Sequence, residues 1–195
     1  YGMPLTQAGA QIPPFRVENA KAATEGKWRP HVEATIREDV ARGWLAPAPR
    51  YWRSQWVHPI TAAPKNKDNP DKCRVCQDQS RPAGGSVNDH QRFAHAKWTH
   101  VHAVARKITP GCYMMKLDVQ YFYRNFGVFP PDWPYTACEW DGVQYLDTRV
   151  SFGLRSAPEM CQRVTAAIVW IMHSRGHTGV VGQMDDFGIF AATAK

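Results

Sequence analysis

Apolar residues recur every four positions near the start of the chain. In residues 31–43 they stand at Val32, Ile36 and Val40, which places all three on one face of a helix. Gly43 follows the last of them, where glycine commonly ends a helix. The pattern therefore predicts an amphipathic helix over 31–43.

The clearest helical pattern covers residues 156–176. Ser156 is suited to cap its N-terminus, and Glu159 stands three residues later, as in a capping box. Pro158 lies in the first turn, where a missing N–H costs little, and Gly176 is placed to end the helix. One apolar stripe runs along the predicted helix: Met160, Val164, Ile168, Ile171 and Met172.

Short runs with alternating apolar residues predict strands that pair as hairpins. Residues 56–65 and 73–78 are separated by the basic turn KNKDNPDK, and residues 135–148 fold back around Asp141-Gly142. Residues 180–190, VVGQMDDFGIF, form a third hairpin with two aspartates at its turn. Because Asp is a common turn residue, this pair is by itself compatible with an ordinary acidic turn.

The segments between these hairpins complete the outline. Residues 112–119 read as a strand that ends near Asp118, and residues 93–108 are predicted to be helical. Helices and paired strands are segregated along the chain, so the predicted fold class is α+β with a helix-backed antiparallel sheet.

Three aspartates lie where two of the predicted strands end. Asp118 follows the apolar run MMKL, and Asp185 and Asp186 follow VVGQM. If the two strands are neighbours, the carboxylates meet at one edge of the sheet, where they repel one another unless cations neutralise them. Carboxylate oxygens suit Mg²⁺, and two such ions are the usual device for nucleotidyl transfer.

Composition points to an anionic partner inside the cell. The 195 residues include 24 Lys and Arg against 17 Asp and Glu, a net charge of +7, and nucleic acid is the commonest partner of such a chain. We expect no membrane partner, because no apolar run reaches the length of a transmembrane helix. No signal peptide is visible, and the five cysteines form no regular framework, so we expect an intracellular protein of the nucleus or cytoplasm, not a secreted one.

Five motifs, in order, resemble reverse transcriptases, the RNA-directed DNA polymerases. MKLDVQYFYRNFGVFP, SFGLRSAPEMCQR and QMDDFGIF resemble the three core motifs of that family, and SQWVHPITAAPKNK with CRVCQDQSRP resembles its fingers hairpin. FGLRSAP and the helix after it are most similar to retrotransposon enzymes of the DIRS-like, tyrosine-recombinase type. The resemblance covers the chain from about residue 30 to its end.

The resemblance implies an architecture and partners. It implies the fingers and palm of a right-hand polymerase, with residues 1–92 and 126–155 fingers-like and residues 93–125 and 156–195 the palm. The partners would be an RNA or DNA template with its primer, and deoxynucleoside triphosphates. We expect a thumb, an RNase H domain and a recombinase outside this chain.

The resemblance also implies a role for individual residues. Asp118, Asp185 and Asp186 would be catalytic and would hold two Mg²⁺ ions (or Mn²⁺), assisted by the Val119 carbonyl. Tyr123 would lie under the sugar and leave no room for a 2′-hydroxyl. The remaining implied contacts are with the nucleotide, through Arg74, Lys65, Lys67, Phe152 and Gly153, and with template or primer, through Gln162, Gln183 and Met184.

The chain departs from the family pattern at four positions. Gln183 replaces the Tyr that usually contacts the primer end, and Tyr121 replaces a frequent Asp. Ser80 and Ser151 replace an Arg and a Pro that are often present. These departures leave open a second function, a non-catalytic nucleic-acid-binding module that keeps the fold.

One alternative concerns a metal other than magnesium. Cys73, Cys76, His90 and His95 have the spacing C-x2-C-x13-H-x4-H, which falls within the pattern of a zinc site. Against it, Ser80 and Ser86 stand where such a finger needs apolar core residues, and a Pro-Ala-Gly-Gly loop occupies the expected start of its helix.

Overall fold

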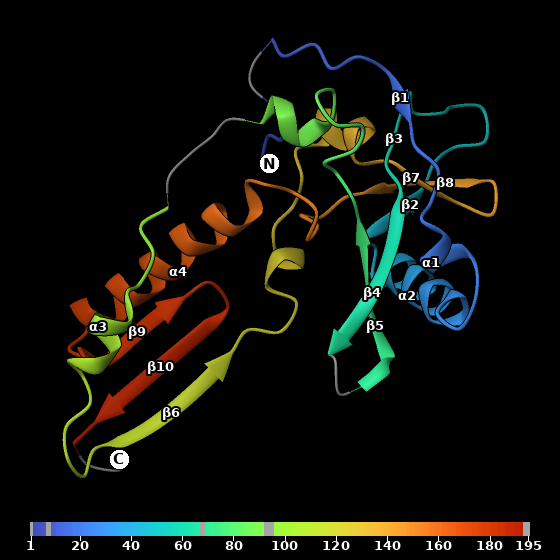
Figure 1. Cartoon of the computed structure of the whole chain (residues 1–195). Helices are drawn as coiled ribbons and strands as arrows, with labels where there is room; N and C mark the ends of the chain where they lie inside the picture. Colours follow the sequence, from blue (N-terminus) through green and yellow to red (C-terminus); the bar gives the residue numbers. More distant parts are fainter. Residues whose placement is uncertain (1, 7–8, 67–68, 92–95, 193–195) are drawn as a thin grey trace. The chain divides into compact units, whose positions relative to one another are not determined.

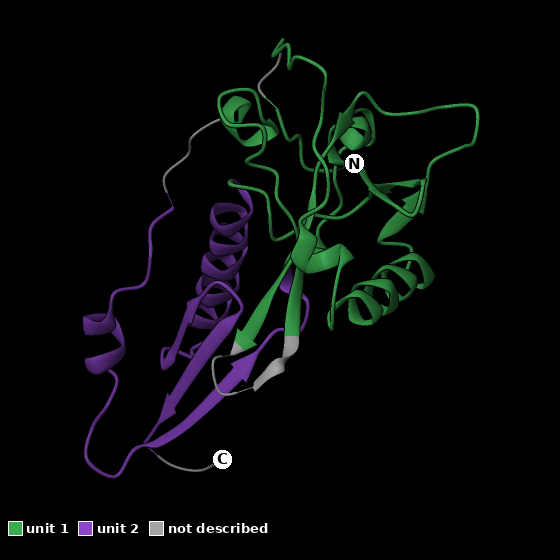
Figure 2. Cartoon of the chain, turned by 45° about the vertical axis from the view of Figure 1, so that its right-hand side comes forward, with its two compact units in different colours: residues 1–92, 123–155 green, residues 93–122, 156–195 purple. Residues whose placement is uncertain are grey.

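The chain divides into two compact units. A computed structural model describes residues 2–6, 9–66, 69–91 and 96–192, with the backbone alone at 66 and 69–72. The first unit comprises residues 1–92 and 123–155, and the second comprises residues 93–122 and 156–195 (Figure 2). Each unit is therefore built from two separate stretches of sequence, and the names fingers and palm stay a prediction for them.

In its described residues, the first unit contains three small sheets, the two α-helices α1 and α2, and two complete 3₁₀ helices. Its longest hairpin joins β4 and β5, and a three-stranded sheet has the order β2-β8-β7 (Figure 1). β1 pairs in parallel with β3. The elements of this unit are β1 (Phe15–Arg16), α1 (Lys21–Thr24), α2 (Arg29–Ala41), β2 (Leu45–Pro47), β3 (Trp56–Val57), β4 (Ile60–Asn66), β5 (Asn69–Gln77), the 3₁₀ helices η1 (Val87–His90) and η3 (Pro130–Thr136), β7 (Cys138–Trp140) and β8 (Val143–Asp147).

The apolar face of α2 provides much of this unit's core. Val32 and Ile36 are buried, and Val40 packs against the same cluster. Gly43 has φ +69°, a left-handed conformation that glycine adopts without steric cost as the chain leaves the helix. The helix predicted over residues 31–43 is thereby confirmed, and it begins and ends two residues earlier.

The second unit is a three-stranded antiparallel sheet with one long helix packed against it. Strand β10 lies between β6 and β9 (Figure 1). Gly182 on β9 lies so close to α4 that a Cβ there would stand 2.6 Å from Thr165 Cγ2. The elements are α3 (Val101–Ala105), β6 (Tyr113–Asp118), α4 (Ala157–Ser174), β9 (Val180–Gln183) and β10 (Asp186–Ala191), and η2 (Phe122–Asn125) spans the division between the units. The predicted α+β class, the three hairpins and the long helix are confirmed.

Two local predictions are wrong. Residues 93–108 do not form one helix: α3 is short, and residues 93–95 lie outside the described part. Ser156 makes no side-chain capping bond to α4, and Glu159 instead pairs with Arg163 one turn later, at 2.7 Å. A capping box does occur at Ser86 and Asp89, before η1.

The packed face of α4 is also rotated from the predicted stripe. The buried residues are Ala157, Cys161, Gln162 and Thr165, whereas Ile168 and Ile171 are exposed. The small side chains on the buried face let β9 approach the helix closely, as the contact of Gly182 with Thr165 shows. Packing against the sheet, rather than apolar spacing alone, therefore decided which face of the helix is buried.

Candidate functional site

The strand register of the second unit brings two of the three predicted carboxylates together. Asp118, the last residue of β6, lies directly opposite Asp186, the first residue of β10. Side chains of such a cross-strand pair point to the same face of the sheet, with their Cβ atoms about 5 Å apart. The neighbouring strands that the sequence required are thus present.

Asp185 lies in the two-residue turn that connects β9 to β10. Its backbone carbonyl accepts a hydrogen bond from Val119 N–H at 2.9 Å, so the turn is tied to the end of β6. Met184, the other turn residue, has φ +53°, an unusual conformation for a residue with a side chain. The backbone at the end of the hairpin is therefore held in a defined position beside Asp118.

Two side chains of α4 hold this turn in place. Gln162 Oε1 accepts a hydrogen bond from Met184 N–H at 2.9 Å, and Thr165 Oγ1 donates to the Met184 carbonyl. Gln162 is only 3% exposed. The structure thus gives Gln162 a contact with the turn, while its predicted contact with a template, like that of Gln183, stays a prediction.

A lysine next to the carboxylates compensates part of their charge. Lys116 precedes Asp118 by two residues on β6, so both side chains lie on one face of the strand. Its Nζ lies 2.9 Å from Asp186 Oδ1, and both side chains are largely exposed. The hydrogen bond with Asp186 raises the pKa of Lys116 above its ordinary value. The ammonium group thereby neutralises one carboxylate of a pair that would otherwise repel.

The donor chemistry at this edge suits a hard cation, but the side chains do not converge on one point. Asp118 and Asp186 are exposed and Asp185 is half-buried, so their oxygens are accessible, and such oxygens are the ligands that Mg²⁺ prefers. Among the described residues, however, no three His, Cys, Asp or Glu side chains are grouped as a metal site. Asp186 is turned toward Lys116 instead.

An open cleft lies along the same sheet. Its volume is about 410 Å³, and it reaches Lys116, Gln183 and Asp186. Its other walls are mostly apolar and come from α3, the segment before it and all three strands. They include Thr99, Val104, Met114, Val181 and Phe190.

In the first unit, two predicted nucleotide contacts touch each other. The rings of Tyr123 and Phe152 meet edge to face, with their centroids 4.8 Å apart. Tyr123 is 9% exposed, whereas Phe152 is 65% exposed. The aromatic pair thus has one fixed ring and one ring that is open to solvent.

The loop that carries Phe152 is fixed to the end of β5 and to the segment after it. Gly153 packs against Gln77, where a Cβ would stand 2.0 Å from the backbone oxygen, so no other residue fits. Its carbonyl accepts a hydrogen bond from Asn88 Nδ2 at 2.8 Å, and Ser151 Oγ accepts one from Gln79 Nε2 at 2.9 Å. The glycine of the FGL motif is therefore required by a close approach between backbones.

The predicted triphosphate contacts lie on the β4–β5 hairpin. Arg74 lies on β5 opposite Ala63, and Lys65 lies on β4; both are exposed. Lys67 lies outside the described residues. Two cationic side chains of the hairpin are thus accessible to an anionic ligand.

The same strand argues against the zinc alternative. Cys73 and Cys76 are three residues apart on β5, so their side chains point to opposite faces of the hairpin. Cys73 is buried in the core cluster that includes Ile36 and Leu45. His95 lies outside the described residues. The two cysteines cannot bind one ion while this strand is formed.

Comparisons with known proteins relate this fold to one group of solved structures. No known family model matches the sequence, and no curated protein matches it either. Solved structures of the protease-reverse transcriptase of prototype foamy virus do match, with a TM-score of 0.70 and 22% identity over 95% of this chain. The chain has a reverse transcriptase-like fold.

Two foamy viral protease-reverse transcriptase structures that match contain nucleic acid. One is a complex with an RNA/DNA hybrid (TM-score 0.73, 20% identity, 97% of this chain) and one a complex with double-stranded DNA (0.72, 20%, 98%). This chain spans only 22 to 30% of the length of these three matched chains. The similarity therefore describes a reverse transcriptase-like fold, and the DIRS-like type is not shown.

Two residues of this reverse transcriptase-like fold were not singled out from the sequence. Lys116 had a detectable signal, because its two-residue spacing from Asp118 places both on one strand face. Arg124 had none, since its partners Asp39 and Asp147 are 85 and 23 residues away.

In the described part of the chain, no helix is both long enough and apolar enough to span a membrane.

Proposed function

We propose that this chain carries the fingers and palm of an RNA-directed DNA polymerase from a retroelement of the DIRS-like type. The reaction is attack of a primer 3′-hydroxyl on the α-phosphate of a deoxynucleoside triphosphate, directed by an RNA or DNA template in the nucleus or cytoplasm. The observation that carries the proposal is the register that sets Asp118 opposite Asp186, with Asp185 in the adjoining turn.

In this proposal the three aspartates hold two Mg²⁺ ions, with Mn²⁺ as an alternative, and the Val119 carbonyl assists. When bound, the ions supply activation of the primer hydroxyl and neutralisation of the leaving pyrophosphate. To hold a cation, Asp186 would exchange its ion pair with Lys116 for that cation. The exposure of both side chains makes this exchange inexpensive, because exposed ion pairs are weak.

The other residues bind and select the nucleotide and the primer–template. Arg74, with Lys65 or Lys67, holds the triphosphate by charge-assisted hydrogen bonds. Tyr123, fixed against Phe152, excludes a 2′-hydroxyl, so deoxynucleotides are preferred. Phe152 and Gly153 form the floor beneath the base. Gln162 keeps the turn at Met184 in place, so that Met184 and the adjacent Gln183 can contact template and primer.

Primer extension on an RNA template with Mg²⁺ tests the proposal directly. We expect the wild-type chain, at its full natural length, to extend a primer and Asp185→Asn to abolish extension. Asp141→Asn is the matched control, because Asp141 also lies at a hairpin turn but in the other unit. Extension that survives Asp185→Asn, or a wild type that binds primer–template without extending it, contradicts the enzyme.

A second candidate is a non-catalytic nucleic-acid-binding module with the same fold. The ion pair of Lys116 with Asp186 favours it, because a lysine already occupies one carboxylate. Binding of primer–template that is unaffected by both Mg²⁺ and Asp185→Asn, without extension, is the outcome that supports this candidate.

A further inference from the structure

Arg124 directly follows Tyr123 in η2, and its side chain is directed into the first unit rather than into solvent. The Arg124 side chain is 14% exposed. Around it the segment YFYRNF is otherwise aromatic and amide in character. A charge buried beside the residue proposed to select the sugar requires an explanation, because burial of an unpaired charge is very costly.

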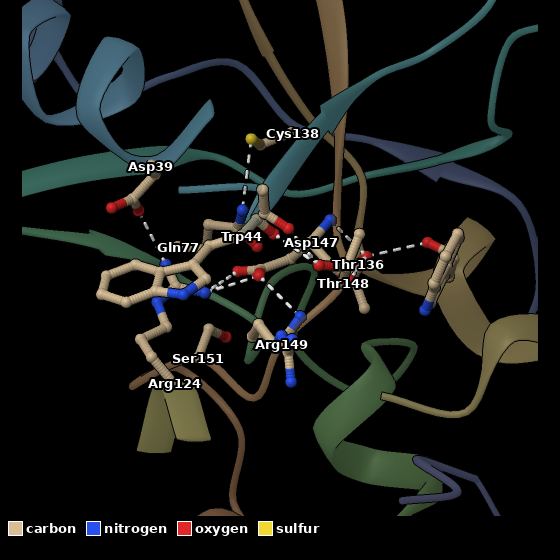
Figure 3. A network of polar contacts seen from close by, with 12 residues as sticks. Asp39, Trp44, Gln77, Arg124, Thr136, Cys138, Asp147, Thr148, Arg149 and Ser151 are labelled. Atoms are coloured by element: carbon tan, nitrogen blue, oxygen red, sulfur yellow. Dashed lines mark hydrogen bonds and ion pairs between the residues drawn. The ribbon is translucent and has the colours of Figure 1, made fainter. Parts of the chain in front are cut away.

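Two buried carboxylates compensate this charge (Figure 3). Arg124 Nη1 donates to both carboxylate oxygens of Asp147, at 2.6 Å to Oδ2, and Nη2 donates to Asp39 Oδ2 at 3.0 Å. The ring of Trp44 lies 5.7 Å from the guanidinium carbon. The planar group is therefore held by a fork of hydrogen bonds and an adjacent aromatic ring.

The carboxylates are themselves fixed to separate elements. Asp147 ends β8 and is fully buried, and the Thr136 hydroxyl bridges its backbone N–H and C=O at 2.8 and 2.9 Å. Arg149 N–H donates to the Asp147 carboxylate at 3.2 Å. Asp39 belongs to α2. Arg124 thus joins η2 to a helix and to a strand that are far from it in sequence.

The hydrogen bonds of the backbone pass this constraint to the aromatic pair. Phe126 N–H donates to the Tyr123 carbonyl at 3.1 Å, and Val150 N–H donates to the Phe126 carbonyl at 2.9 Å. Tyr123 and Phe152 therefore stand on two segments that are bonded to each other. The ion pair anchors the same two segments. Arg124 is one residue from Tyr123, and Asp147 is five residues from Phe152.

Arginine is needed at this position for its shape as well as its charge. Arg124 directs two nitrogens of one plane to different carboxylates, Nη1 to Asp147 and Nη2 to Asp39. A lysine ammonium is a single point charge and cannot reproduce this fixed pair of donors. The pair of Arg29 with Asp141 offers a contrast on the same unit. Arg29 Nη2 also bonds both oxygens of one carboxylate, at 2.9 Å to Oδ1 and 2.8 Å to Oδ2, but this pair is exposed.

We propose that Arg124 is a positioning residue for sugar selection. Held by Asp147 and Asp39, it fixes the turn that presents Tyr123, and so it sets how strictly a 2′-hydroxyl is excluded. The inference rests on the proposed polymerase function and deepens it. The Tyr123 ring can exclude a 2′-hydroxyl only while its backbone is held in place, and the buried ion triad holds it there.

The test is the ratio of kcat/KM for a deoxynucleotide to that for the matching ribonucleotide. Arg124→Lys should lower this ratio about tenfold, since displacements of about 1 Å change rates by large factors. The turnover of the deoxynucleotide should change much less. Arg29→Lys, the matched control on an exposed pair, should leave the ratio unchanged. An unchanged ratio in a folded, active Arg124→Lys enzyme overturns the inference.

Two further measurements keep the inference distinct from the proposed function. Nucleotide affinity measured on a primer ended with a dideoxynucleotide needs no chemistry, so it reports selection even if extension fails. Loss of extension by the wild type contradicts the polymerase, whereas equal deoxy-to-ribo affinity ratios in wild type and Arg124→Lys contradict the role of Arg124. Absence of any sugar preference in the wild type also overturns it.

A second variant addresses folding. Arg124→Met combined with Asp39→Leu and Asp147→Leu replaces the triad by apolar side chains of similar volume, a change that buried ion groups commonly tolerate. This variant lacks the fork of hydrogen bonds and should also lose selectivity. Full selectivity in the folded triple variant contradicts the inference.

Discussion

The two units use the same pair of residue types, aspartate and a basic side chain, in opposite ways. In the first unit, Asp147 is fully buried and Asp39 nearly so, and both are bonded to Arg124. In the second unit, Asp186 is half exposed and is bonded to Lys116, which is more exposed still. The acidic residue is the same in both groups, and burial separates them.

The difference explains what each group can do. Buried carboxylates have lost their water and depend on every bond of the guanidinium, so they hold elements together and cannot exchange partners. Exposed carboxylates keep their water and lose little when the lysine leaves. Lysine, a mobile point charge, suits a pair that opens, and arginine, a rigid fork, suits a pair that stays closed.

The largest effect that tests this comparison is on stability. Arg124→Met should lower the free energy of unfolding by about 3–5 kcal/mol, because it leaves two buried carboxylates without a cation. Lys116→Met is the control from the exposed pair and should leave the midpoint of urea denaturation nearly unchanged. Similar losses of stability in Arg124→Met and Lys116→Met would show that burial does not distinguish the two ion pairs.

An intermediate effect is expected on cation binding. Lys116→Gln should tighten binding of Mn²⁺ about two- to fivefold, because an exposed ion pair competes only weakly for Asp186. Titration calorimetry on the chain measures this without any catalysis. Lys107→Gln removes a lysine of the same unit that bonds a carbonyl, that of Thr178, and should leave the affinity as in the wild type. Weaker binding by Lys116→Gln would assign the lysine a supporting role instead.

The smallest effect concerns pH. Burial raises the pKa of the Asp39 carboxyl above its ordinary value, and the positive charge of Arg124 opposes this only in part. A raised pKa means that the stabilising contribution is complete below about pH 3.9 and is lost as the pH rises through the folded-state value.

Asp39→Asn removes this pH dependence. The free energy of unfolding of the variant, relative to that of the wild type, should therefore be higher at pH 7 than at pH 4. Between the two pH values, the difference in free energy of unfolding between variant and wild type should change by no more than about 1 kcal/mol, the net contribution of a typical hydrogen bond. Urea denaturation at the two pH values measures it. If the difference between variant and wild type is equal at the two pH values, the raised pKa of Asp39 is contradicted. A wild type that gains stability relative to the variant at pH 7 contradicts it as well.

Much of the fold was readable from local pattern. The four-residue spacing of Val32 and Ile36 and the turn at Asp141-Gly142 each placed an element correctly, because these signals act within a few residues. The cap predicted at Ser156 failed because the residue takes a helical backbone conformation, so its side chain makes no capping bond. The buried face of α4 was misjudged because close packing with β9 favoured small side chains such as Cys161 and Thr165.

The sequence alone determined which residues were available: three aspartates at strand ends, an aromatic five positions after the first of them, and a glycine before the long helix. Only the tertiary structure decided which acids are exposed and which are buried. Asp118 meets Asp186 through strand register, and Arg124 meets Asp147 and Asp39 through packing across 23 and 85 residues. Charge pairing at such separation depends on the folded backbone and on loss of water, and neither is encoded within a short stretch of sequence.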